Sequence, residues 1–356
     1  DAYVRELHGG LPRTQQYLFQ EVFRGQPEGI RRCLLRSAIL DRFCPALLEA
    51  VYVDDDASAF DGEGSESVDL LYRGDLFTVA IDDHGRWSRY HHLFREFLLG
   101  QLEQEFSTSR IETLHARASS WFEAEGLVDE AIRHALSAKD PNRAADLVVR
   151  HRHLAMEQHG WSVLERWLER LPESLRRQRA DLRITRLFVL SEQYRVAEMS
   201  ALIEELELAP AKESLSGAMA TELDLFAGVV CLFRDWDAET ARKRLEAAKR
   251  RGRPEADLIR SRIELYLALA STVAGEPERA LSSLEAEIRS VPEQEGPLRA
   301  RMLGSLAIVR LLSSDLFGAV RDGERTIHAV EGNHVPAVEA FGRYVKANAQ
   351  FQGYQL

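Results

Sequence analysis

The sequence predicts an all-α protein with one small β-hairpin. Two short stretches of alternating apolar residues, Leu76–Ile81 and Arg86–Tyr90, flank the tight polar loop Asp82–Gly85, a pattern that is typical of a hairpin. Elsewhere the apolar residues recur at helical spacing, and from about residue 180 a helix–turn–helix unit repeats. Together these observations predict a winged-helix domain followed by an α-superhelix of the tetratricopeptide-repeat (TPR) type.

The winged-helix-like module is expected to cover residues 1–106. Helices are predicted from Leu11 to about Phe23, from Gln26 and from near Pro45, because proline is well tolerated at the start of a helix. Residues 54–67 are acidic and small and predict a loop, and a short helix at residues 68–71 leads into the hairpin. A helix with four apolar residues on one face follows the hairpin directly: Leu93, Phe94, Phe97 and Leu98.

The charge of this module argues against a DNA-reading role. A winged helix that reads DNA presents basic or amide side chains to the major groove. Here the region before the wing carries Glu63, Glu66 and Asp69, and the wing tip is Asp82–Asp83. Since these carboxylates would repel phosphate, we expect a spacer or interaction module. DNA binding by the winged helix is the weaker alternative.

Residues 107–179 are expected to be connecting helices that begin the superhelix. Ile111, Leu114 and Ala118 form one apolar stripe, and Gly126 is placed to end that helix. The helix that starts at Trp161 is expected to stop at Leu171, which precedes a proline.

Residues 180–356 are predicted to be TPR-like helical repeats. Ala197, Ala241, Ala280 and Ala319 each follow a short turn, at intervals of 44, 39 and 39 residues. A period of about 40 residues is typical of stacked helix pairs that bury their apolar faces on their neighbours. An irregular helical bundle is the alternative. Residues 350–356 carry no polar outer stripe, so the repeats are expected to be truncated here.

Composition limits the class of protein. The chain is 45% hydrophobic and 29% charged, with a net charge of −11, which argues against a protein that clamps nucleic acid. Neither a signal peptide nor an apolar stretch of about 20 residues is present, so we expect a cytoplasmic protein without membrane contact. Cys33, Cys44 and Cys231 are widely spaced and are expected to be reduced core thiols.

Three stretches resemble the MalT-type branch of LuxR-family transcriptional regulators. They are Leu34–Val51, Leu76–Leu99 with its Arg86-Trp87 and Tyr90–Phe94 block, and Leu114–Val149 with its Trp121-Phe122, Glu130–Ile132 and His134–Leu136 blocks. Beyond about residue 150 the resemblance is one of architecture only. It implies a signal-transduction ATPase, a winged helix, a superhelical sensor and a C-terminal helix-turn-helix in the full-length protein, of which this chain would be the middle part.

The resemblance also implies what this chain would lack. It contains no GxxxxGK[ST] phosphate-binding loop and no basic recognition helix at its end. We therefore expect no ATP hydrolysis and no operator binding from this chain, and no cofactor; ATP would be bound only by the absent N-terminal domain. No catalytic serine, paired-carboxylate or Cys–His motif is recognisable either, so an enzyme is not expected.

His91, His92 and Glu96 are the most suggestive polar cluster for a metal. Adjacent histidines on a helix point about 100° apart, however, whereas zinc favours an i, i+4 pair. We expect no metal, with one imidazole packed under the hairpin near Trp87 and Tyr90 and the other capping the helix or hydrogen-bonding. His151, His153 and His159 have no carboxylate partner in register and are expected at the surface.

The candidate ligand-binding residues are Arg262, Arg301 and Glu222. Aligning the repeats by their alanines places Arg262 and Arg301 at equivalent positions on the concave face, with Glu222 one repeat earlier. Two stacked arginines could bind an anion or a hydroxyl-rich ligand. The alternative is that they are solvated surface charges, and Tyr266, Phe226 and Phe341 are read as interhelical core.

Two functions follow from this organisation. The first is the ligand-sensing and self-association region of a MalT-like activator, which binds a small-molecule inducer on the concave face of the superhelix and shifts the full-length protein towards self-association. The second is a TPR-like scaffold that binds a peptide or a regulatory protein.

Overall fold

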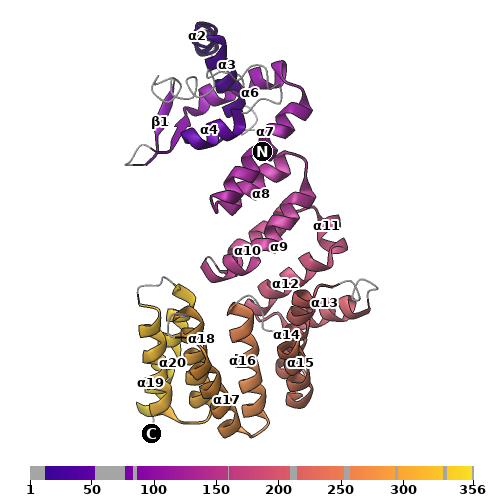
Figure 1. The fold of residues 1–356 in the computed structure, drawn as a ribbon, viewed down its shortest axis with the longest axis vertical. Helices are drawn as coiled ribbons and strands as arrows, with labels where there is room; N and C mark the ends of the chain where they lie inside the picture. The colour runs from indigo at the N-terminus through magenta and orange to yellow at the C-terminus, as the bar shows by residue number, and fades with distance from the viewer. Residues whose placement is uncertain are drawn as a thin grey trace. The chain divides into compact units, whose positions relative to one another are not determined.

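The computed structural model describes residues 13–52, 77–82, 86–158, 160–208, 215–251, 257–292, 296–331 and 335–354, with side chains from residue 19 onward. The chain forms two compact units, residues 1–147 and 148–356 (Figure 1). None of the described helices is long and apolar enough to cross a membrane.

The winged helix occupies the first part of the first unit. Its elements are α2 (Arg13–Arg24), α3 (Glu28–Ser37), α4 (Pro45–Tyr52), β1 (Thr78–Ala80), β2 (Ser88–Tyr90) and α6 (His92–Glu105). β1 and β2 pair antiparallel with Thr78 opposite Tyr90, which confirms the predicted hairpin. The predicted loop at residues 54–67 and the short helix at 68–71 lie outside the described residues, as does most of the hairpin loop.

Aromatic residues form the core of the winged helix. Phe94 on α6 lies in ring contact with Phe19 of α2, with Phe77 before β1 and with Tyr90 of β2. The buried Tyr90 hydroxyl lies 2.6 Å from the Ser37 hydroxyl, so the polar end of this ring is satisfied inside the core. The apolar spacing after the hairpin is thereby explained, since it places one face of α6 against both the wing and the first helices.

Two further helices complete the first unit together with the N-terminal part of α9 (Pro141–Gln158). They are α7 (Thr108–Ala124) and α8 (Val128–Ser137). Trp87 in the hairpin meets Trp121 of α7 edge to face at 6.1 Å, and the guanidinium of Arg42 lies 4.5 Å from the Trp87 ring centroid while it pairs with Glu130 of α8. The unit boundary thus falls within the segment that the sequence assigns to connecting helices, 107–179.

The second unit consists of helices only among its described residues. They are the C-terminal part of α9 (Pro141–Gln158), then α10 (Trp161–Arg170), α11 (Glu173–Gln178), α12 (Ala180–Glu192), α13 (Val196–Leu208), α14 (Gly217–Phe233), α15 (Ala238–Arg250), α16 (Asp257–Val273), α17 (Pro277–Ser290), α18 (Gly296–Leu312), α19 (Leu316–Ala329) and α20 (Pro336–Tyr354).

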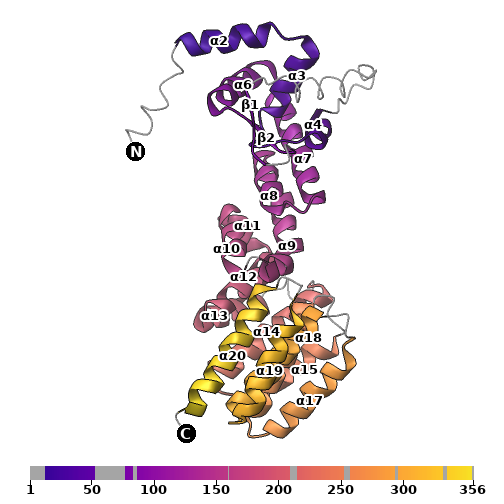
Figure 2. The same cartoon turned by 90° about the vertical axis from the view of Figure 1, so that its left-hand side faces the viewer.

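The helices from α12 onward are arranged in two layers. The first helices of the pairs, α12, α14, α16, α18 and α20, contact one another in sequence. Each second helix, α13, α15, α17 or α19, packs against the first helix of its own pair and against the next one (Figure 2). This is the packing of a TPR-like superhelix, so the predicted fold class is confirmed and the irregular bundle is excluded for the described repeats.

A common turn joins the two helices of each pair. Tyr194, Trp236, Gly275 and Ser314 all have positive φ, and each stands two residues before the second helix. The chain reverses through this left-handed residue, which is the usual end of an α-helix.

The fourth residue of each second helix is fully buried, and it is Ala241, Ala280 and Ala319 in the last three pairs. Only a small side chain lets the two helices approach closely there. In the first pair the equivalent residue is Met199, which is buried, whereas Ala197 is exposed. The prediction that Ala197 is equivalent to Ala241, Ala280 and Ala319 is therefore wrong. The equivalent residue is Met199, so an alignment of the repeats by their alanines gives the wrong register for the first pair.

The three cysteines are free thiols. Cys33 is buried in α3, where burial raises the pKa of its thiol to about 12, and Cys44 and Cys231 are partly buried with raised pKa values for the same reason. The raised pKa values favour the protonated thiol at neutral pH.

Candidate functional site

Glu222, Arg262 and Arg301 occupy the same position in three successive inner helices. Each is the sixth residue of its helix, in α14, α16 and α18 respectively. Their side chains are only 2%, 14% and 11% exposed. They are therefore not the solvated surface charges of the alternative interpretation, and each is paired with a charge on another helix.

Glu222 is paired with two residues of α9. Arg152 Nη2 donates to Glu222 Oε1 at 2.6 Å, and His153 Nε2 lies 2.8 Å from the same oxygen. Burial on its own would raise the pKa of the Glu222 carboxyl, but the hydrogen bonds from His153 and Arg152 and the charge of Arg152 outweigh it and lower that pKa. Glu222 is thus an ionised carboxylate inside the helical stack.

The two arginines are also paired with residues far away in the sequence. Arg262 of α16 is paired with Glu192 of α12, and Arg301 Nη1 of α18 lies 3.1 Å from Glu157 Oε1 of α9. Each of these pairs, like that of Glu222, joins helices that are not consecutive in the chain. We call the whole group the inner-face ion layer: Arg152, His153, Glu157, Glu192, Glu222, Arg262 and Arg301.

Phe188 of α12 contacts two members of this layer, His153 and Arg262. Its ring centroid lies 5.5 Å from the His153 ring and 4.9 Å from Phe226 of α14, and the Arg262 guanidinium is 5.8 Å from it. Phe188 and Phe226 are both fully buried. Together with Tyr266 and Phe341, which pack on neighbouring clusters, they are interhelical core, as the sequence indicates.

One buried acceptor in the layer is unused. The second carboxylate oxygen of Glu222, Oε2, is inaccessible to solvent and accepts no hydrogen bond from any residue that the structure describes. A buried charged oxygen without a donor is unfavourable, so the arrangement holds this carboxylate in a state that an additional donor would stabilise.

Sequence reasoning missed the partners of the three candidates. Arg152, His153, Glu157 and Glu192 carry no local signal, because their partners lie 69 or more residues away. The expectation that His153 is a surface residue is wrong, because its carboxylate partner, Glu222, lies on another helix and not in register on α9. His151 is partly buried, and His159 lies outside the described residues.

The region around His91 and His92 also differs from the expectation. Both imidazoles are exposed, their ring centroids lie 4.5 Å apart, and His91 makes no side-chain cap to α6. Neither ring packs under the hairpin, because Phe94, Tyr90 and Phe77 already fill that space. Among the described residues, no group of three or more His, Cys, Asp and Glu side chains could hold a metal ion.

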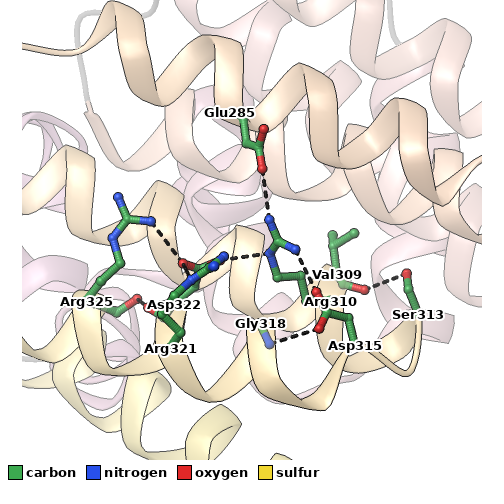
Figure 3. Close-up of polar contacts among 10 residues, drawn as sticks. Glu285, Val309, Arg310, Ser313, Asp315, Gly318, Arg321, Asp322 and Arg325 are labelled. Atoms are coloured by element: carbon green, nitrogen blue, oxygen red, sulfur yellow. Dashed lines mark hydrogen bonds and ion pairs between the residues drawn. The ribbon is translucent and has the colours of Figure 1, made fainter.

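A second dense ion cluster lies on the later repeats and has a different character. Arg310 of α18 donates to Glu285 of α17 at 2.9 Å, to Asp315 at 2.6 Å and to Asp322 of α19 at 2.9 Å (Figure 3). Asp322 is fully buried and also accepts from two other arginines, while Asp315 caps α19 through the Gly318 amide. Every group in this cluster is paired within one or two neighbouring helices, so it fixes the α17–α19 packing and does not form a binding site.

Comparison with known proteins agrees with the fold. A family model described as the MalT winged helix domain matches residues 19–110. The serine/threonine-protein kinase PknK of Mycobacterium tuberculosis is 30% identical over 236 residues, which cover 65% of this chain and 20% of that protein. The HTH-type transcriptional regulator MalT of Cronobacter sakazakii is 30% identical over 217 residues, covering 61% of this chain and 23% of that protein.

A solved structure extends the likeness beyond the winged helix. The signal transduction ATPase with numerous domains (STAND) protein with a tetratricopeptide repeat sensor, PH0952 from Pyrococcus horikoshii, superimposes with a TM-score of 0.62 at 12% identity over 95% of this chain and 50% of that chain. This likeness shows the fold. The chain spans about a fifth of the length of the curated relatives it matches. The resemblance seen in the sequence is confirmed: the chain carries a MalT-type winged-helix domain followed by a TPR-like helical region.

Proposed function

We propose that this chain is the ligand-sensing and self-association region of a MalT-like, LuxR-family transcriptional activator, and that it binds a small-molecule inducer at the inner-face ion layer. One observation carries the proposal: ion pairs largely withdrawn from water join non-consecutive helices, α9 with α14, α12 with α16 and α9 with α18. On this proposal the chain acts by binding, while ATP and operator DNA are bound by other parts of the full-length protein.

The pairs suit a sensor because they hold the curvature of the repeats. A ligand group that replaces Glu192 as the partner of Arg262, or Glu157 as the partner of Arg301, releases one helix from another. A ligand that binds one arrangement more tightly shifts the population towards it, and a factor of about 100 in affinity is worth about 2.7 kcal/mol. Such a shift would expose or withdraw surfaces for self-association.

The proposal is tested by a thermal-shift screen of the purified chain against sugars and metabolites, with binding of any hit measured by calorimetry. The expected hit stabilises the chain and binds at least about tenfold more weakly to Arg262→Gln and Arg301→Gln. Arg343→Gln is the matched control, because Arg343 is 68% exposed and pairs only with Glu339 in its own helix. A hit that binds all four proteins equally contradicts the proposed site.

A scaffold that binds a peptide or regulatory protein is the second candidate, and a different surface favours it. Large apolar side chains are exposed at the turn ends of the pairs: Phe233, Trp236, Val273, Leu312 and Phe317. Apolar side chains that gather at one edge are typical of protein-interaction surfaces. Capture of a specific partner that is lost with Trp236→Ser and Phe317→Ser, together with no metabolite hit, would support the scaffold over the sensor.

A further inference from the structure

A cavity outside the inner-face ion layer lies between four consecutive helices of the second unit. It has a volume of about 830 Å³ and is lined by residues of α10, α11, α12 and α13. No member of the inner-face ion layer lines it. Its volume is in the range of about 300–1,000 Å³ that is typical of small-molecule sites. We call it the α10–α13 pocket.

The floor of the α10–α13 pocket is apolar. Leu168 of α10 and Leu182, Val189 and Leu190 of α12 line it, and all four are buried in the helical core. These side chains are fixed by packing between the helices, so the floor is preformed. It offers an apolar surface to a ligand that enters from the charged rim.

The rim is charged, and most of its charges are paired. Of its five arginines, Arg183 lies 2.7 Å from Glu205, Arg195 donates to both oxygens of Glu198 at 2.5 and 2.6 Å, and Arg177 pairs with Glu173. Glu165 accepts a hydrogen bond from Gln193 at 3.0 Å. These groups satisfy one another and leave little net charge for a ligand.

Two arginines of the rim remain without a carboxylate partner. Arg176 of α11 and Arg186 of α12 make no ion pair with any residue that the structure describes, and Arg176 Nε is a buried donor without an acceptor. Among the lining carboxylates, Glu169 makes no ion pair with a described residue, and Glu165 is bonded to the neutral Gln193 amide instead of an arginine. The five arginines and five glutamates that line the pocket balance in number, so the positive charge open to a ligand is confined to Arg176 and Arg186.

We propose that the α10–α13 pocket binds a small molecule that carries one carboxylate or phosphate group on an apolar body. The anionic group pairs with Arg176 and Arg186, since guanidinium groups bind both kinds of oxyanion strongly. The apolar body lies on Leu168, Leu182, Val189 and Leu190. Glu169 repels a ligand with further negative charges, so singly anionic amphiphiles are preferred.

The test uses four probes with the same apolar chain and different head groups: octanoate, octyl phosphate, octanol and octylamine. Binding to the purified chain is measured by titration calorimetry below the concentration at which the probes aggregate. We expect octanoate or octyl phosphate to bind at least about tenfold more tightly than octanol and octylamine, and the tighter of the two identifies the head group as carboxylate or phosphate. Equal binding of all four, or no binding of either anion, overturns the proposal.

Three substitutions locate the site. Arg186→Gln, at an exposed position, should weaken anion binding by about tenfold, and Ala201→Phe should block the pocket from its rim. Arg177→Gln is the control, because Arg177 lines the same pocket but is 78% exposed and already paired. Unchanged binding by Arg186→Gln, or an equal loss with Arg177→Gln, overturns the assignment. Arg262→Gln and Arg301→Gln should leave anion binding unchanged, so this result is independent of the proposed sensor site.

Discussion

Some buried charges in this protein are stable because a partner from a distant part of the chain reaches them. Glu222 illustrates this, because its ionised state depends on Arg152 and His153 of α9. Breaking a buried pair by removal of one partner is strongly destabilising, whereas replacing both partners with neutral groups is much less so. The residues that hold the inner face are thus coupled in pairs.

Substitution of Arg152 tests this coupling. Arg152→Met should lower the free energy of unfolding of the chain by about 3 kcal/mol or more, since it leaves the Glu222 carboxylate without its main counter-charge. The double variant Arg152→Met, Glu222→Gln should recover a large part of that loss. Urea denaturation followed by tryptophan fluorescence measures both. A double variant that is no more stable than Arg152→Met contradicts the pairing.

Gly318 gives a second test at the scale of single residues. A β-carbon there would overlap the Asp315 carboxylate and the Arg310 side chain, so the α19 cap and the ion cluster cannot both keep their geometry. Gly318→Ala should lower the free energy of unfolding by about 1–3 kcal/mol. Gly353→Ala is the control in the same unit, because an added β-carbon there meets only Leu316 at 3.9 Å; a loss equal to that of Gly318→Ala would argue against the clash.

The sequence predicts one member of each inner-face ion pair but not its partner. The spacing of Arg262 and Arg301 indicates their equivalence, since both follow the repeat, and Glu222 occupies the same position. Glu157, Glu192 and His153 follow no period, because they meet their partners only after the helices have stacked. Periodicity therefore predicts positions within a repeat, while contacts between non-consecutive helices need the three-dimensional structure.

The turns that join the two helices of each pair share one backbone conformation, although the residue at the left-handed position differs between pairs. Ser314 has a φ of 62° in the turn between α18 and α19, where Gly275 stands in the preceding pair. The left-handed region is unfavourable for residues with a β-carbon by about 1 kcal/mol. Because the residue type at this position varies, the sequence indicates these turns less clearly than the alanines that follow them.

Ser314→Gly should therefore raise the free energy of unfolding by about 0.5–1 kcal/mol, because glycine adopts this conformation without strain. Ser282→Gly, on the exposed face of α17, should lower it by a similar amount, because glycine is unfavourable inside a helix. Denaturation midpoints compared with the unchanged chain measure the two signs. The same sign for both variants would contradict the assigned turn.

The α7–α8 hairpin contains a pH-sensitive pair. His115 Nδ1 lies 2.9 Å from His134 Nδ1, and burial, with the nearby positive charge of Arg95, lowers the pKa of His115 to about 4. Burial lowers the pKa of His134 to about 3, with the charges of His115, Arg133 and Arg95 adding to it. The unfolded chain, with ordinary histidine pKa values of about 6.5, binds more protons than the folded chain below neutrality.

The stability of the first unit should consequently be greatest above pH 6.5 and fall by a few kcal/mol as the pH decreases towards 4. His134→Gln should flatten this dependence, because it removes one group whose pKa is depressed by folding. His92→Gln, at an exposed position, is the control and should leave the slope unchanged. Thermal melts between pH 7 and pH 4 provide the measurement; identical slopes for the two variants would contradict the role of the buried pair.

At the scale of the molecule, the chain consists of two compact units that each possess a core. The core of the first is centred on Phe94, and the later repeats have their own clusters around Leu303 and Ala319. Most of this organisation is visible in the sequence, since the hairpin, the apolar spacing and the period of the repeats predict the fold. The division within α9 is not, because a continuous helix carries no break in its pattern.

Calorimetry should resolve the two units. Tyr90→Phe removes a buried hydrogen bond to Ser37 and should lower the stability of the first unit by about 1 kcal/mol. Arg152→Met should move only the transition of the second unit. A calorimetric scan that shows one common transition, displaced by both variants, would contradict independent units.

The link between Arg301 and Glu157 has a mechanical consequence. It joins the fourth inner helix of the repeats directly to α9, which precedes all of them, so this ion pair closes a loop that contains the intervening helix pairs. Breaking the Arg301–Glu157 ion pair would let each intervening helix pair rotate slightly, and these rotations would add up along the stack. Loss of this one ion pair could thus produce a displacement of helices far from it in the stack.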